Sequence, residues 1–193
     1  MEEGRKQTMW RWLAILVGVV TLSALSGVGA YQLVRPVLER DHVRWHEIAW
    51  NFPRDGWPAG RAFRCNHCGK DGGAVELYVR PKVGFCNCNT GVADDDEVDR
   101  VADLDLISAT FAPLEAGKEV YVADMKGRSR SYDLKMSDGS QHNAVGIALS
   151  HHCDLLVAVA QGRANADEMR RAALDYLASD AMHHWMLASL GGH

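Results

Sequence analysis

The chain has 193 residues, of which 24% are charged, with a formal net charge of −4 and five cysteines. About 160 residues outside an apolar N-terminal segment are enough for one domain with a hydrophobic core. The acidic balance and the lack of a basic run exclude a surface that follows a phosphate backbone, so we expect no nucleic-acid partner.

An uncharged, apolar stretch lies between Trp12 and Val34. About 20 apolar residues in a helix cross the hydrocarbon core of a bilayer, and a helix satisfies its own backbone hydrogen bonds there. The stretch therefore predicts a transmembrane signal anchor over 12–34 that contacts membrane lipid. A short tail, 1–11, precedes this segment, and a linker, 35–45, follows it.

The charges that flank this segment do not decide its orientation. Three basic residues lie on each side of it: Arg5, Lys6 and Arg11 before, and Arg35, Arg40 and Arg44 after. The short tail and the signal-like shape favour a soluble domain on the extracytoplasmic, periplasmic side. The alternative is a secretory signal that is cleaved after Ala30, because Val28-Gly29-Ala30 has the small-residue spacing of a cleavage site.

The first part of the soluble region, 46–193, predicts short strands. Period-two apolar patterns indicate strands over His46–Phe52, Arg61–Cys65 and Val75–Val79. The acidic run Asp94–Glu97 is interpreted as a solvated loop or as the start of a helical turn, since it lacks the spaced ligands and glycine of a calcium loop.

A strand meander and two helices follow. The five predicted strands are Leu104–Phe111, Glu119–Met125, Ser129–Met136, Asn143–Leu149 and Asp154–Ala160, with hairpin turns at Lys126-Gly127 and Asp138-Gly139. Asn165 is the expected N-cap of a helix that reaches Leu177, and a last helix carries Met182 to Leu190. The predicted fold class is α+β: a transmembrane helix, then one antiparallel sheet with the C-terminal helices packed on one face.

Four cysteines lie within the 24 residues 65–88, namely Cys65, Cys68, Cys86 and Cys88. In an oxidising compartment an even set of cysteines usually pairs. Cys86 and Cys88 are too close for an easy mutual bridge, so we expect each to reach across to Cys65 or Cys68. Each such bridge closes a loop of roughly 20 residues and stabilises the domain by about 3 kcal/mol.

A metal site is the second interpretation of the same cysteines. The segment Cys65-x2-Cys68-Gly-Lys resembles the first knuckle of a zinc ribbon, whereas the second pair, Cys86-x-Cys88, has one intervening residue instead of two. Four thiolates suit one tetrahedral zinc ion, and fewer suit copper(I). His67, His151 and Cys153 can add ligands, although an unpaired buried cysteine is the commoner reading of Cys153.

Catalytic thiol exchange is the third interpretation. A reactive Cys-x2-Cys pair lies at a helix N-terminus, which lowers the thiol pKa. Here glycines and a strand follow Cys68 instead of a helix, which disfavours this chemistry.

No catalytic set is recognisable in the sequence. There is no nucleophile elbow, phosphate loop or dinucleotide-binding turn. We therefore predict a non-enzymatic protein whose external domain binds a membrane protein and helps assemble a larger membrane complex. The alternatives are a copper- or zinc-handling protein that serves a membrane enzyme and, third, a thiol-disulfide oxidoreductase.

Overall fold

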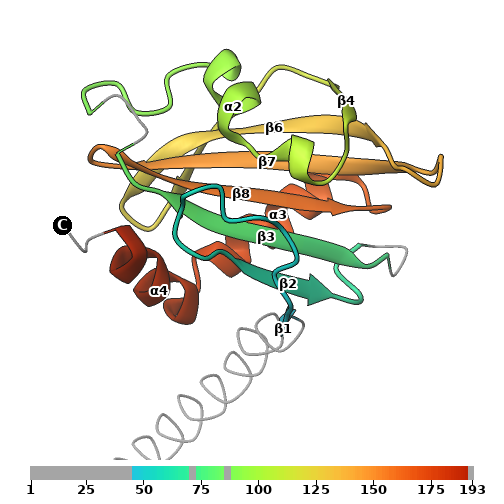
Figure 1. Cartoon of the computed structure of the whole chain (residues 1–193), viewed down its shortest axis with the longest axis horizontal. Helices are drawn as coiled ribbons and strands as arrows, with labels where there is room; N and C mark the ends of the chain where they lie inside the picture. Colours follow the sequence, from blue (N-terminus) through green and yellow to red (C-terminus); the bar gives the residue numbers. More distant parts are fainter. Residues whose placement is uncertain (1–44, 70–72, 85–87, 191–193) are drawn as a thin grey trace, which may run out of the picture. The chain divides into compact units, whose positions relative to one another are not determined.

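The computed structural model describes residues 45–69, 73–84 and 88–190, which belong to one compact unit, 42–193. An antiparallel sheet of eight strands dominates this unit (Figure 1). Its strands are β1 (Trp45–Ile48), β2 (Arg61–Cys65), β3 (Val75–Lys82), β4 (Thr110–Pro113), β5 (Lys118–Val122), β6 (Met125–Lys135), β7 (Gln141–His151) and β8 (Asp154–Gly162). The strand order is β1-β2-β3-β8-β7-β6-β4, and β5 pairs with a second stretch of β6.

The central strands are buried, which accounts for their nearly continuous apolar sequences. Six of the residues in β7, 144–149, and eight in β8, 155–162, are buried. A strand that is covered on both faces reads as a nearly continuous apolar run, whereas a half-buried strand alternates. The outer strand β4 is exposed along its whole length.

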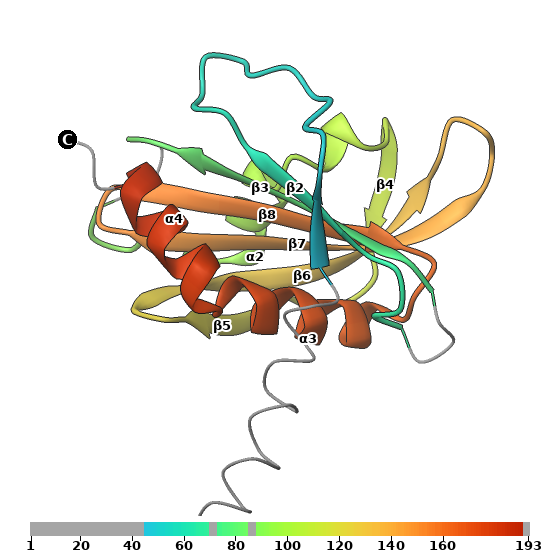
Figure 2. The ribbon, with the colours of Figure 1, turned by 90° about the horizontal axis from the view of Figure 1, so that it is seen from below.

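Two C-terminal helices cover one face of the sheet. They are α3 (Ala166–Leu177) and α4 (Asp180–Leu190), which lie along the sheet in Figure 2. Asn165 caps α3 as predicted, because its side-chain oxygen accepts a hydrogen bond from the Asp167 amide. The first core lies between these helices and the sheet and includes Phe63, Leu77, Ile147, Met169 and Met186.

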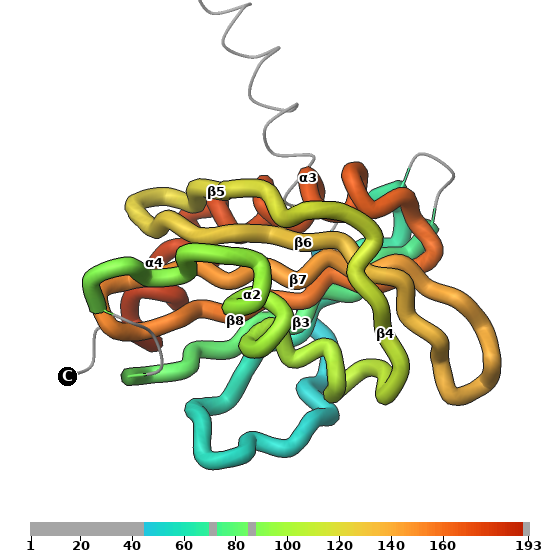
Figure 3. The backbone as a smooth tube through the Cα atoms, turned by 90° about the horizontal axis from the view of Figure 1, so that it is seen from above, coloured from blue at the N-terminus to red at the C-terminus, as the bar shows by residue number. Residues whose placement is uncertain are grey.

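A short helix and a 3-10 turn cover part of the opposite face. They are α2 (Asp95–Val101) and η1 (Leu104–Leu106), and Figure 3 shows α2 on this side of β6, β7 and β8. The second core lies beneath them and includes Val98, Leu104, Tyr132 and Val157. The acidic run therefore begins a helix, with Asp94 as the N-cap that accepts from the Glu97 amide.

The structure corrects the predicted fold class. Instead of an α+β domain behind a transmembrane helix, with helices on one face only, the described chain is mostly an antiparallel sheet with a few short helices on both faces. The longest helix in the described ranges, α3, has 12 residues, and none of the helices there is long and apolar enough to cross a membrane. The predicted span 12–34 lies outside the described residues.

Two predicted strand boundaries are also wrong. The segment Leu104–Phe111 forms η1 before β4 begins at Thr110, because a short apolar alternation does not distinguish a strand from a packed turn. Gly127 lies inside β6, not in a hairpin turn. A Cβ atom on Gly127 would lie 1.9 Å from the Ala148 carbonyl oxygen, so this glycine serves the close approach of β6 and β7.

Candidate functional site

The four described cysteines form two disulfides. Cys65 pairs with Cys68, with a Cα–Cα distance of 5.7 Å, and Cys88 pairs with Cys153, with a distance of 4.2 Å. The predicted bridges between the 65/68 pair and Cys88 are therefore wrong, as is the reading of Cys153 as an unpaired thiol. Cys86 lies outside the described residues.

The disulfides bear directly on the predicted metal ligands. A disulfide sulfur is not a thiolate, so Cys65, Cys68 and Cys88 can act as thiolate ligands only after reduction. His67 is exposed in the turn between its two cysteines, and the ring of His151 contacts that of His152 at the end of β7. Within the described ranges there is no group of three or more His, Cys, Asp or Glu side chains that could hold a metal ion. One zinc or copper ion on the four cysteines stays a prediction.

The disulfides also indicate the kind of compartment in which the domain is found. Disulfides persist in oxidising compartments and are rare in the cytosol. The pairs Cys65–Cys68 and Cys88–Cys153 therefore indicate an oxidising, extracytoplasmic environment for this domain.

A hollow that we call the polar groove lies where β2 ends and β3 begins, at the right-hand end of the sheet in Figure 1. It has a volume of about 350 Å³. Its lining residues come from β2, β3, β7, β8 and the adjoining turns: Arg64, Asn66, Gly73, Ala74, Glu76, His142, Gln161, Gly162 and Arg163. Asn66 lies between the two cysteines of the Cys65–Cys68 bridge, so this disulfide fixes one wall of the groove.

The sheet register brings the groove's polar side chains together. Arg64 lies opposite Glu76 on the neighbouring strand, and Glu76 lies opposite Gln161 on the next. Residues directly opposite one another share a face of the sheet and their side chains touch. These side chains lie on the face of the sheet that carries the second core. Val157 and Val159 of β8 belong to that core, and Gln161 follows them at the same two-residue spacing, so it lies on the same face.

A hydrogen-bonded relay runs through these side chains. Arg64 donates through Nε to Oε1 of Glu76 at 3.0 Å, and Gln161 donates through Nε2 to Oε2 at 2.8 Å. The Gln161 amide oxygen therefore faces His142, and its distance to His142 Nδ1 is 2.8 Å. Since an amide oxygen only accepts, His142 donates through Nδ1, and Nε2 is the ring atom that this bond leaves unused.

The relay keeps Glu76 ionised. Burial alone would raise the pKa of its carboxyl, but hydrogen bonds from Tyr78, Arg64 and Gln161 outweigh burial and lower the pKa below its usual value. The pKa of the Tyr78 hydroxyl is raised by burial and by the Glu76 carboxylate that it donates to. Glu76 is thus a fixed negative charge at the centre of the relay.

A Glu76→Gln substitution removes this charge, and its effect on the free energy of unfolding should depend on pH. The lowered folded pKa means that the carboxylate stabilises the fold above its unfolded pKa of 4.5, and that this stability is lost as pH falls through the folded pKa. We expect the variant to lose about 2 kcal/mol of unfolding free energy at pH 7 and the difference from the native chain to shrink below that unfolded pKa. Urea unfolding of both proteins at neutral and acidic pH measures it.

Glu47→Gln is the matched control for this experiment. Glu47 accepts from Arg61 at 2.9 Å, but its side chain is 52% exposed. We expect less than about 1 kcal/mol there. If Glu76→Gln lowered the unfolding free energy by the same amount at both pH values, the charge of Glu76 would not be what stabilises the fold.

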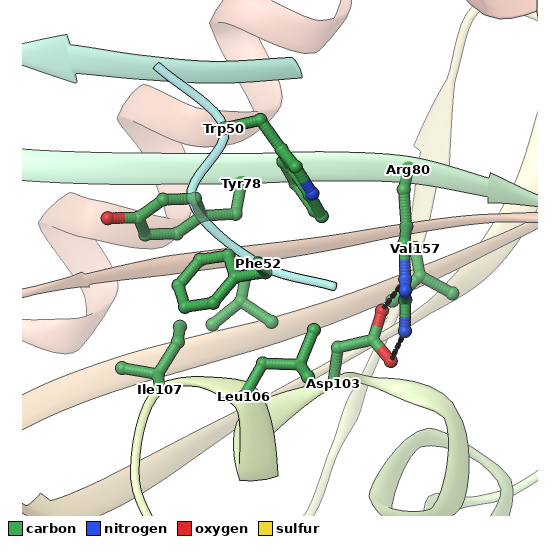
Figure 4. A pocket seen from close by; sticks show the side chains of 9 residues that line it. Trp50, Phe52, Tyr78, Arg80, Asp103, Leu106, Ile107 and Val157 are labelled. Carbon is green, nitrogen blue, oxygen red and sulfur yellow. Dashed lines mark hydrogen bonds and ion pairs between the residues drawn. The ribbon is translucent and has the colours of Figure 1, made fainter. Parts of the chain in front are cut away.

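A second cavity lies on the same face, beside η1, and is shown in Figure 4. Trp50 and Phe52, from the segment after β1, pack edge-on against Tyr78. The Arg80–Asp103 ion pair closes the other side. The remaining space is about 10 Å³, close to the smallest that holds one water. The side chains around this cavity pack the loop after β1 against the sheet. The polar groove, which is larger, is therefore the better candidate site.

Sequence reasoning missed the polar groove. None of Arg64, Glu76, His142, Gln161 or Arg163 belongs to a recognisable motif. The available signal was the alternation of Glu76, Tyr78 and Arg80 with the apolar residues of β3, which indicates one polar face. The sequence does not say which strands pair with β3, and therefore which side chains lie beside its polar residues.

Fold and groove together define a disulfide-bonded, antiparallel β-sheet domain with a polar groove at one end of the sheet. The sequence matches no known protein family and no curated protein. Among solved structures it is similar to a protein of unknown function from Pseudomonas aeruginosa, at 12% identity and a TM-score of 0.38, over 75% of this chain and 93% of that one. This distant likeness carries no functional argument.

Proposed function

We infer that this protein is a non-enzymatic binding domain that works outside the cytoplasm and helps assemble a larger complex by holding a partner protein in the polar groove. The observation that carries the inference is the groove itself, of about 350 Å³. Binding pockets typically range from about 300 to 1,000 Å³. That the partner is a membrane protein follows from the sequence prediction alone.

Rigidity of the groove supports this function. Its side chains are held by one another through the relay of His142, Gln161, Glu76 and Arg64, and its rim is held by the Cys65–Cys68 disulfide. A site that is ordered before binding loses less conformational entropy when a partner arrives. The groove therefore suits recognition of a partner segment without a large rearrangement.

A photo-crosslinking side chain in place of Asn66 tests the proposal in cells that express the full chain. Asn66 is exposed at the groove, so irradiation should give a covalent adduct with one defined protein. The same probe in place of Asp175, which is exposed on α3 across the sheet, should not give that adduct. Mass spectrometry identifies the adduct and should find the same protein in replicate preparations.

Two results would overturn the inference. One is no protein adduct from position 66 when the chain is expressed and folded. The other is the same set of adducts from positions 66 and 175, since general surface collisions do not depend on the groove.

A further inference from the structure

Several hydrogen-bond donors of the polar groove have no partner among the described residues. Arg64 uses Nε and one terminal nitrogen on Glu76, which leaves the other terminal nitrogen of its guanidinium. Arg163 is exposed at the groove and makes no ion pair with another described residue. Asn66 adds a side-chain amide from the turn.

Glu76 does not compete for a ligand's donors. Its Oε1 accepts from Arg64, and its Oε2 accepts from both Tyr78 and Gln161. A carboxylate engaged on both oxygens is poorly placed to bind a cation or a donor from a ligand. The groove therefore offers positive charge and donors to its contents.

The charges of the described lining residues favour a single negative charge. Among these residues, two arginines and one carboxylate give a formal charge of +1 when histidine is counted as neutral. A carboxylate monoanion matches this balance. A phosphate dianion would add a second negative charge close to that of Glu76, where like charges repel.

From this balance we propose that the polar groove recognises a carboxylate presented by the partner protein, with Arg163 and the free nitrogen of Arg64 as its donors. This inference rests on the proposed function for its partner, but the anion site itself stands on the geometry. Arginine binds carboxylates through parallel N–H donors, so one arginine can both attract and orient the group. Arg163 is the residue to test, because substituting it breaks no ion pair with another described residue.

Acetate is the simplest probe of the site. The full chain, labelled with ¹⁵N and purified in its oxidised form, is titrated with sodium acetate and, separately, with methyl phosphate at constant ionic strength. Acetate should shift the amide signals of Arg163 and of the residues around Gln161, and methyl phosphate should bind more weakly. Arg163→Glu should weaken acetate binding at least about tenfold, because it removes a charge-assisted hydrogen bond, whereas Arg163→Lys, which keeps the charge but not the parallel donors, should weaken it less.

Arg171→Glu is the matched control. Arg171 is exposed on α3, across the sheet from the groove, so this variant makes the same change in net charge. It should leave the acetate titration unchanged. Equal weakening by Arg163→Glu and Arg171→Glu would overturn the proposal, as would tighter binding of methyl phosphate than of acetate.

The crosslinking experiment distinguishes the two inferences. If the adduct from position 66 persists in Arg163→Glu, the groove binds its partner without a carboxylate, and only the further inference fails. If acetate binds at Arg163 but position 66 gives no protein adduct, the anion site stands and the proposed partner function fails. Loss of the adduct in Arg163→Glu, with its retention in Arg163→Lys, supports both.

Discussion

Breaking the Cys88–Cys153 disulfide should lower the unfolding free energy by about 4 kcal/mol in the chain-entropy account of crosslinks. The two cysteines are 65 residues apart in sequence, so the bridge removes a large loop-closure entropy from the unfolded chain. Reduction of a Cys65→Ala/Cys68→Ala variant breaks this bridge alone. The expected loss is the difference in unfolding free energy between its oxidised and reduced forms, measured by urea unfolding.

The other bridge is an internal comparison. Cys65 and Cys68 are only three residues apart, so reduction of a Cys88→Ala/Cys153→Ala variant should cost about 2 kcal/mol. Each experiment compares two redox states of one sequence. The effect of the alanine substitutions themselves, including the replacement of the buried Cys65 in the first variant, therefore cancels. Equal losses for the two bridges would contradict the assignment of Cys88–Cys153 as the main covalent staple.

Asp103→Asn should cost about 3–5 kcal/mol of unfolding free energy, because it leaves two buried cations without the carboxylate that they share. Arg80 donates to Asp103 through Nε at 2.5 Å and through Nη2 at 2.6 Å, and Lys82 donates to it at 2.7 Å. The side chains of Arg80 and Lys82 are only 5% and 7% exposed. Asparagine also tolerates the left-handed backbone of Asp103, whose φ is +55°, so the substitution isolates the charge.

Asp55→Asn is the matched control for this prediction. Asp55 also has a left-handed backbone, with φ of +52°, and its carboxylate lies 3.7 Å from Arg80 Nη1, but its side chain is 51% exposed. An exposed ion pair contributes at most about 1 kcal/mol. Similar losses from Asp55→Asn and Asp103→Asn in urea unfolding would show that burial of the pair has little effect.

Local pattern sufficed for much of the strand and helix content. A strand was predicted over Asp154–Ala160, and β8 occupies this stretch and is buried on both faces. Asn165 predicted the start of α3 from its capping chemistry alone. Gly127 was misassigned because a glycine that allows two strands to approach closely has the same local signature as one in a turn.

The candidate site was not predictable in the same way. The hydrogen bond from Gln161 to Glu76 joins residues separated by 85 positions. No spacing rule connects them, since the contact arises from the pairing of β3 with β8. Arg163 owes its candidate role only to the neighbours that this pairing brings to the groove.

By itself, the sequence determined that this protein contains strands and two C-terminal helices, and it favoured disulfide pairing of the cysteines without deciding it. These properties depend on side-chain periodicity, capping and sulfur chemistry, which are local. Only the tertiary structure decided that Cys88 pairs with Cys153, that helices cover both faces of the sheet and that Arg64, Glu76 and Gln161 form one relay. Those outcomes depend on strand order and register, which are set by the burial of the whole sheet and not by any one segment.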